Sequence, residues 1–288
     1  MSENFFRGVW VIAYRELMRL VMEPTRIVVT LATPLLFLVM FGGGFSRIVG
    51  DMAPGVDFVK FMYPGILAMA VVMPSLFSGL SIVWDREFGF LREILVAPIS
   101  RSGIVVGKAL GGGTMAMIQA MFLLILAPLL GVHIEFGQLV SLVPLLLLLS
   151  MTLSGLGILV ASRMKSQQGF QLVMQLLLLP LMFLSGVFFP VNDVPAWLAA
   201  IAKINPVTYG VDAIRQVMLT GAIHSAATGV GGLVVDGPGK TLTGRLATNV
   251  MGTQLFGHSL SILEEGLFLA ALATVLISLA ACSFGNRE

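Results

Sequence analysis

Six long apolar stretches of the chain contain no Asp, Glu, Lys or Arg, and this pattern restricts the possible folds more than any other feature. A helix needs about 20 mostly apolar residues to cross the hydrocarbon core of a bilayer. Each stretch is long enough, so the sequence predicts six transmembrane helices. These helices are expected at about 27–46, 61–84, 109–131, 139–161, 169–189 and 266–286.

The composition excludes a water-soluble domain. Hydrophobic residues make up 57% of the 288 residues and charged residues only 11%, whereas a soluble domain has roughly 25% charged residues. A chain of this length has too little interior to bury so much apolar surface. The fold class is therefore expected to be an all-α integral membrane protein, forming a single transmembrane domain over 1–288. No basic run is present, so the lipid bilayer is an expected partner and nucleic acid is not.

Positive charge sets the expected orientation, because short cytoplasmic loops carry an excess of Lys and Arg. The side that holds both termini collects eleven such residues in its short segments, and the other side two. Both termini are therefore expected in the cytoplasm. No short apolar core with a small-residue cleavage site precedes the first span, so no cleavable signal peptide is expected.

Residues 5–21 are predicted to form an amphipathic helix ahead of the first span. Apolar side chains recur there at helical spacing, and three arginines fall elsewhere on the helix. Such a helix is typical of the headgroup layer of a membrane. The apolar positions are Phe6, Trp10, Ala13, Leu17 and Val21, and the arginines are Arg7, Arg15 and Arg19.

The first cytoplasmic loop, 85–101, alternates charges of both signs with large apolar residues. Pro98 ends any helix that begins near Asp85. Two interpretations fit the pattern equally well. The segment could present an apolar ridge to the groove of a partner protein, or it could be a solvated connecting helix at the membrane surface.

The last outer segment, 190–264, begins with apolar residues at helical spacing on both sides of the Asn205-Pro206 pair. Two short helices at the outer surface fit this pattern, and a simple capping loop is the alternative. Glu264 and Glu265 precede the last span and are expected to be solvated acids at a helix start, where the helix dipole favours them.

The chain carries no pattern typical of an enzyme. No HExxH, G-x-S-x-G or Cys–His arrangement is present, and the one cysteine cannot form a disulfide or a zinc site. We therefore expect no catalytic residue, no metal and no cofactor in this chain. Ion-driven carriers usually keep charged residues inside the membrane, and the six predicted spans contain none. A separate subunit is thus the expected source of energy.

Neutral polar residues do occur inside the predicted spans. Ser75 and Ser78 lie in the second span, and Gln171 and Gln175 lie four residues apart in the fifth. They could line a transport path, although hydrogen bonding between helices is the more ordinary role for such residues.

Three features together resemble the permease subunits of type-2 ATP-binding-cassette exporters, in the bacterial branch that exports drugs, lipids, lipo-oligosaccharides or polysaccharides. One is the amphipathic start before the first span. The others are two motifs: Arg86-Glu87-x-Gly-x-Leu-Arg92-Glu93-Ile-Leu-x-Ala97-Pro98-Ile-Ser100-Arg101 with Gly107-Lys108, and Ser185-Gly186-x-Phe188-Phe189-Pro190 with Trp197, Asn205-Pro206-x-Thr208-Tyr209 and Asp212-x-x-Arg215. The resemblance covers about 1–218 and, by position, the last span.

The resemblance implies a homodimer or heterodimer of six-span subunits in the bacterial cytoplasmic membrane. Two cytoplasmic ATPase subunits would bind the ATP and Mg²⁺ and would drive export of an amphipathic cargo, which is compatible with a role in antibiotic resistance. An ion-coupled secondary carrier or a channel without an ATPase is the alternative.

The resemblance also implies roles for particular residues. A coupling helix over 85–98 would contact the ATPase, short gate helices would lie between spans five and six, and spans two and five would line the path. The expected coupling residues are Arg86, Glu87, Leu91, Arg92, Glu93 and Leu95. The expected outer gate residues are Phe188, Phe189, Pro190, Trp197, Asn205, Pro206 and Tyr209, and the expected path-lining residues are Ser75, Ser78, Gln171 and Gln175.

Overall fold

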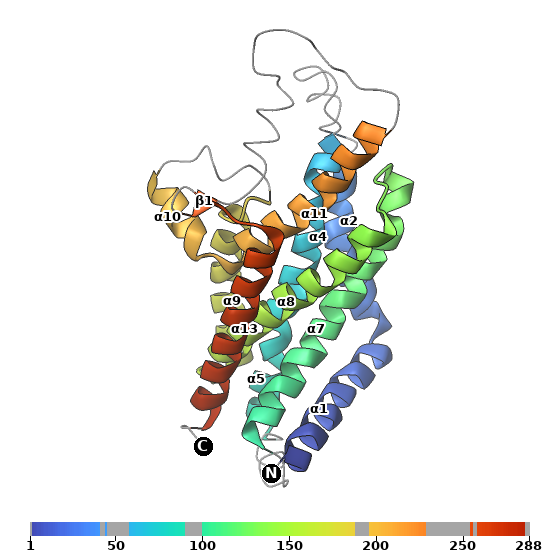
Figure 1. The fold of residues 1–288 in the computed structure, drawn as a ribbon. Helices are drawn as coiled ribbons and strands as arrows, with labels where there is room; N and C mark the ends of the chain where they lie inside the picture. The colour runs from blue at the N-terminus through green and yellow to red at the C-terminus, as the bar shows by residue number, and fades with distance from the viewer. Residues whose placement is uncertain are drawn as a thin grey trace.

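The structure, a computed structural model, describes residues 2–40, 44, 58–89, 100–187, 196–228, 254–255 and 258–285. These residues form a bundle of helices that run side by side (Figure 1). The helices are α1 (Ser2–Met22), α2 (Pro24–Val39), α4 (Phe58–Leu76), η2 (Phe77–Gly79), α5 (Leu80–Glu87), α7 (Arg101–Leu126), η3 (Ala127–Leu130), α8 (Phe136–Ala161), α9 (Gln167–Phe183), α10 (Ala196–Ile204), α11 (Pro206–Thr228) and α13 (Ile262–Gly285). Two short strands, β1 (Gln254–Leu255) and β2 (His258–Ser259), pair antiparallel.

Four stretches of helix are long and apolar enough to cross a membrane. They are Met62–Glu87, Ser102–Leu130, Phe136–Ala161 and Ile262–Ser283. This finding confirms a helical, multi-pass membrane protein. The first and fifth predicted spans correspond to shorter apolar helices, Val28–Val39 and Gln167–Phe183, so the six-span layout stays a prediction.

The continuous stretch α4–η2–α5 is the central element of the bundle. In an 18-residue apolar part of this stretch, 72% of the residues are buried, whereas in the corresponding part of α13 the share is 17%. It packs against α2, α7, α8 and α11. A helix apolar on all sides is expected in such a position, because neighbours or lipid cover every face.

The central element is irregular where it crosses α8. Pro74 removes a backbone donor, and the 3-10 turn η2 follows within one turn of helix. At this point Gly79 and Gly157 bring the two backbones together. A Cβ on Gly79 would collide with the Gly157 carbonyl, and one on Gly157 with the Leu76 carbonyl. Small residues allow such close packing in membrane helices.

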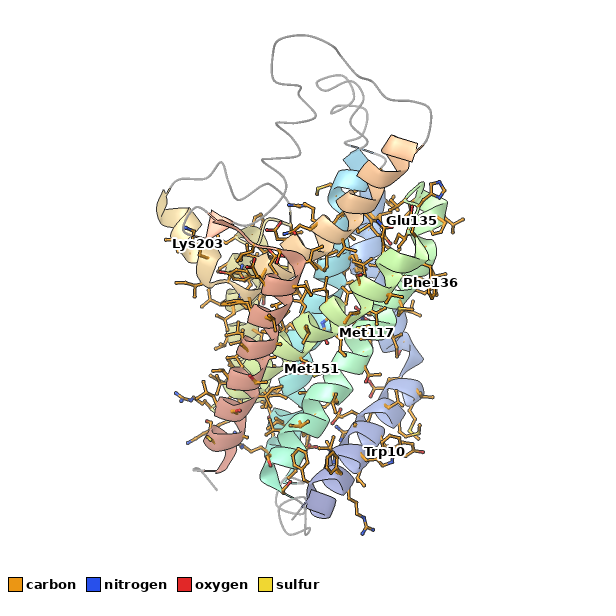
Figure 2. The ribbon with its side chains drawn as sticks, viewed as in Figure 1. Trp10, Met117, Glu135, Phe136, Met151 and Lys203 are labelled. Carbon is orange, nitrogen blue, oxygen red and sulfur yellow. The ribbon has the colours of Figure 1, made fainter. Side chains whose placement is uncertain are left out.

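Helix α1 lies along α7 in Figure 1. Gly107 and Gly111 provide the space, because a Cβ at either position would meet Ile12 or Glu16. Trp10 on the opposite face points away from the bundle and is 72% exposed (Figure 2). The predicted helix is present, with its apolar face exposed, and its depth in the membrane stays a prediction.

The bundle has two ends, which we call the lower and the upper end as they appear in Figure 1. Helix α1 begins and α13 ends at the lower end, where α5 also ends and α7 begins. Helices α10 and α11 lie at the upper end. The described ends of the chain therefore lie on the same side, as the sequence predicts for an even number of crossings.

Candidate functional site

A buried ion pair joins the central element to α7 at the lower end. Lys108 Nζ lies 2.7 Å from Asp85 Oδ2, and the two side chains are 0% and 2% exposed. Lys108 also donates to Ser81 Oγ at 2.9 Å. Buried charges are stable only when they are paired and hydrogen bonded, and this arrangement meets that requirement.

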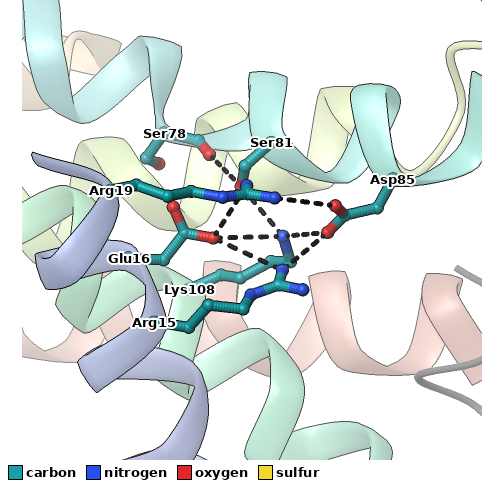
Figure 3. Close-up of polar contacts among 7 residues, drawn as sticks. All are labelled: Arg15, Glu16, Arg19, Ser78, Ser81, Asp85 and Lys108. Carbon is teal, nitrogen blue, oxygen red and sulfur yellow. Dashed lines mark hydrogen bonds and ion pairs between the residues drawn. The ribbon is translucent and has the colours of Figure 1, made fainter. Parts of the chain in front are cut away.

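Helix α1 supplies three more charges to this site (Figure 3). Arg15 donates to Asp85 Oδ2 at 2.9 Å, and Arg19 lies 3.5 Å from Asp85 Oδ1. Glu16 Oε1 lies 3.5 Å from Lys108 Nζ. We call Arg15, Glu16, Arg19, Asp85 and Lys108 the ionic cluster. It links three helices that are far apart in the sequence.

The next two residues connect the end of α5 to the α8–α9 turn. Arg86 donates to the carbonyl oxygens of Ala161, Ser162 and Met164 at 3.4, 3.3 and 2.8 Å. These carbonyls lie where α8 ends and have no partner within their own helix. Glu87 Oε2 accepts the backbone N–H of Gln167, the first residue of α9, at 3.1 Å.

Three consecutive residues thus join the end of α5 to four other helices at the lower end. Asp85 contacts α1 and α7, Arg86 contacts the end of α8, and Glu87 contacts the start of α9. Gly89 follows with φ 81°, a left-handed conformation that favours glycine and ends the helix. Of the expected coupling residues, Leu91, Arg92, Glu93 and Leu95 lie outside the described residues.

At the upper end, hydrogen bonds from neutral side chains hold the junction of α10 and α11. Asn205 accepts the N–H of Val207 at 3.0 Å, which caps α11, and Pro206 occupies the first helical position. The Asn205 amide also donates to the Leu181 carbonyl of α9 at 2.8 Å. This explains why an Asn-Pro pair stands between two short helices.

Further contacts from α11 reach the turn that follows α9. Thr208 donates to the carbonyls of Ala202 and Leu184 at 2.9 and 3.3 Å, and Arg215 donates to Gly186 at 2.9 Å. Tyr209 is buried and donates to Lys203 at 2.6 Å. Burial raises the pKa of the Tyr209 hydroxyl, and the nearby Glu265 carboxylate acts in the same direction.

The structure corrects the prediction for the two acids before the last span. Glu264 is exposed, but Glu265 is fully buried. Glu265 hydrogen bonds to Asp212 and accepts from Gln216 at 3.2 Å, because α11 packs on the first turn of α13. The sequence shows a helix start there but not the second helix that covers it.

Comparison with known proteins decides the family. Residues 7–219 match the family model described as ABC-2 type transporter. The chain therefore belongs to the ABC-2 type transporter family. It is a membrane permease subunit of an ABC transporter, which confirms the resemblance seen in the sequence.

Individual members of the ABC-2 family resemble the chain at moderate identity. The transport permease ycf38 of Cyanophora paradoxa is 32% identical over 216 residues, which cover 73% of this chain and 74% of that protein. Nodulation protein J of Rhizobium meliloti (strain 1021) is 27% identical over 205 residues, covering 70% and 78%. A protein named as a multidrug ABC transporter permease, YbhR of Escherichia coli (strain K12), is 29% identical over 171 residues, covering 59% and 46%.

The expected gate and path-lining residues are only partly among the residues that the structure describes. Asn205, Pro206 and Tyr209 come together at the upper end. The expected gate residues Phe188, Phe189 and Pro190 lie outside the described residues, as does the side chain of Trp197. The two pairs of expected path-lining residues differ in their exposure to the surroundings. Ser75 and Ser78 lie on the central element, where Ser75 is fully buried, and Gln171 and Gln175 are exposed on α9.

Sequence reasoning missed most of the ionic cluster as a site. Glu16 and Lys108 are 92 residues apart, so no local pattern joins them. The available signal was Gly107 and Gly111 on either side of Lys108, because two glycines one turn apart indicate a closely packed neighbour. Among the described residues, no group of three or more His, Cys, Asp or Glu could hold a metal ion.

Proposed function

We propose that this chain is the membrane-spanning half of an ATP-driven exporter and that the loop following α5 docks on a cytoplasmic ATPase subunit. The observation that carries the proposal is the set of contacts made by Asp85, Arg86 and Glu87. These residues immediately precede the loop and contact α1, α7, α8 and α9. A displacement of the loop by the ATPase would therefore act on all four of these helices.

The proposal includes six spans and a cytoplasmic location of the lower end. Val28–Val39 and Gln167–Phe183 are apolar but short, and they would cross with the residues that adjoin them. The lower end carries the excess of Lys and Arg in short segments, which supports its location in the cytoplasm of the bacterial inner membrane.

The proposal further includes a dimer whose second copy covers α9. One face of this helix is exposed along its length and is mainly apolar, with two amides near its start. The exposed residues are Gln171, Leu172, Gln175, Leu176, Leu179 and Phe183. A face of this kind suits a path for amphipathic cargo between two subunits. The relative named as a multidrug ABC transporter permease is compatible with such cargo.

Reconstitution in proteoliposomes tests the proposal. The pure chain alone should neither hydrolyse ATP nor pump, and ATP-dependent transport should appear when its ATP-binding-cassette partner is added. Leu91→Asp should weaken the complex by at least about tenfold, because one buried apolar anchor often dominates an interface. The matched control is Ile204→Asp, which places the same charge on an exposed residue at the opposite end. Transport by the pure chain, or equal loss in both variants, would contradict the proposal.

A second candidate function is proton-coupled transport, and the buried pair Asp212–Glu265 favours it. The two side chains hydrogen bond to each other, and carboxyl groups inside membrane proteins often mark proton relays. This function requires flux driven by a pH gradient with no ATPase present, and Glu265→Gln should abolish that flux. A chain that pumps only with ATP and its partner removes this candidate.

A further inference from the structure

A cavity of about 200 Å³ lies beside the ionic cluster, between α1, the η2–α5 part of the central element and α7. Its wall is charged on one side, where Glu16, Arg19 and Glu23 line it. The other side is apolar, with Phe77 and Met115. The proposed function does not use this cavity.

Two polar groups in the cavity wall have no hydrogen-bond partner among the described residues. They are the Trp84 indole N–H and the Ser78 hydroxyl. A buried polar group left unpaired costs free energy, so both indicate a ligand that supplies an acceptor. Arg19 adds donors, because its ion pairs of 3.5 and 3.7 Å are longer than the 2.7–2.9 Å of a strong charged hydrogen bond.

The charges around the cavity favour a ligand that carries both signs. Within the ionic cluster, the three bases Arg15, Arg19 and Lys108 outnumber the two acids Glu16 and Asp85 by one. An anion is therefore favoured near Arg19. Glu23 also lines the cavity and makes no capping hydrogen bond to α2, so its carboxylate remains available to a cation.

The size of the cavity fits a headgroup better than a whole amphipathic molecule. Sites for drug-sized ligands usually measure about 300–1,000 Å³, which is larger than this cavity. An open groove of about 360 Å³ continues from it, sharing Glu23, Leu80 and Trp84 and reaching Val29 on α2. A headgroup in the cavity could thus extend its chains along this groove into the bilayer.

We propose that this cavity binds the headgroup of a zwitterionic phospholipid that carries a phosphate and a primary amine. The phosphate accepts hydrogen bonds from Arg19, Trp84 and Ser78. The ammonium group lies against Glu23, and the acyl chains follow the groove past Leu80 and Val29. Charged side chains concentrate at headgroup depth in membrane proteins, and the ionic cluster marks that depth at the lower end. The proposal needs the membrane but no ATPase partner.

Native mass spectrometry of the full, delipidated chain tests the proposal. Short-chain phosphatidylethanolamine, phosphatidylglycerol and phosphatidylcholine are titrated separately, and the retained lipid is counted. Phosphatidylethanolamine should be retained most tightly. Trp84→Phe removes the indole N–H while keeping a smaller aromatic ring, and it should weaken retention about tenfold, the usual size for a hydrogen bond to a charged group. Trp10→Phe, a change on the exposed face of α1, should have no effect.

Further measurements distinguish a lipid from a soluble ligand and provide a second variant in case the first does not fold. Glu23→Gln should shift preference from phosphatidylethanolamine towards phosphatidylglycerol, because it removes the partner of the amine. Free phosphoethanolamine should compete only weakly if the groove holds the chains; strong competition would replace the lipid with a soluble ligand. Ser78→Ala is a second variant in case Trp84→Phe does not fold. Equal retention of the three lipids, unchanged in the variants, would overturn the proposal without affecting the test of ATPase docking.

Discussion

The two ends of the bundle hold their helices together by different chemistry. At the lower end, five charged side chains join α1, α5 and α7, and charge pairs with charge. At the upper end, Asn205, Thr208 and Arg215 reach backbone carbonyls of α9 and the turn after it. The lower contacts are shared among side chains of opposite charge, whereas the upper contacts join side-chain donors to backbone carbonyls, two of them in the case of Thr208.

This difference predicts different responses to change. A shared ionic network can redistribute its pairs when one helix shifts, because each acid faces more than one cation. A side chain that donates to a backbone carbonyl is tied to an atom whose position its helix or turn fixes, so this contact defines a geometry. The lower end is therefore suited to transmit movement, and the upper end to keep the α10–α11 junction in place.

The largest expected effect is that of Lys108→Met. It leaves the buried Asp85 and the half-buried Glu16 with fewer cations, and breaking a buried pair costs about 3–5 kcal/mol. The free energy of unfolding should fall by about 3 kcal/mol, because Arg15 and Arg19 remain. Denaturant unfolding in mixed micelles, followed by circular dichroism, measures it. Lys165→Met, on an exposed lysine, should change it by less than about 0.5 kcal/mol.

The double variant Asp85→Lys with Lys108→Asp tests whether charge or shape matters in the ionic cluster. If the pairing itself stabilises, the exchange should restore part of the loss caused by either single change. If stability is not restored, the contribution of the ionic cluster depends on where each charge lies relative to α1.

A smaller loss is expected from Arg215→Met at the upper end. Its guanidinium donates to the neutral Gly186 carbonyl, and a hydrogen bond with one charged partner contributes about 1.5–3 kcal/mol. The same unfolding measurement should show a loss of about 2 kcal/mol. A loss larger than that of Lys108→Met would reverse the ranking of the two ends.

Asn205→Ala should cost about 1 kcal/mol, because it removes the cap of α11. Asn205→Asp keeps the capping oxygen but removes the amide that donates to Leu181. Its loss of unfolding free energy separates the cap from the contact with α9. Equal losses for the two variants would show that the contact with α9 contributes most.

The smallest effect is expected for Glu87→Gln. The amide keeps an oxygen that can accept from the Gln167 N–H, and Glu87 is exposed. The free energy of unfolding should change by less than about 0.5 kcal/mol, as for most surface substitutions. ATP-driven transport should also persist, and a large loss of transport with unchanged stability would show that the carboxylate contacts the ATPase.

The charge-free stretches were enough to predict a helical membrane protein. They did not predict the burial of charged residues that are covered by a helix distant in the sequence. Asp85 and Lys108 stand at the borders of apolar stretches and read as solvated loop charges, yet α1 and α7 bury them together. Glu265 at the upper end is likewise buried although it stands at the border of an apolar stretch, because α11 covers it. The Asn205-Pro206 break was visible because capping is a local property of the chain.

The contact between Gly79 and Gly157 lies six residues before Asp85, and this spacing has a mechanical consequence. At 1.5 Å per residue, Asp85 is about 9 Å from the contact. If the central element bent there by about 20°, the size of a sharp helix kink, Asp85 would move by about 3 Å. That displacement exceeds the 2.7 Å that separates Asp85 from Lys108. A kink of this size at the glycine contact would therefore be enough to change the partners of the Asp85 carboxylate.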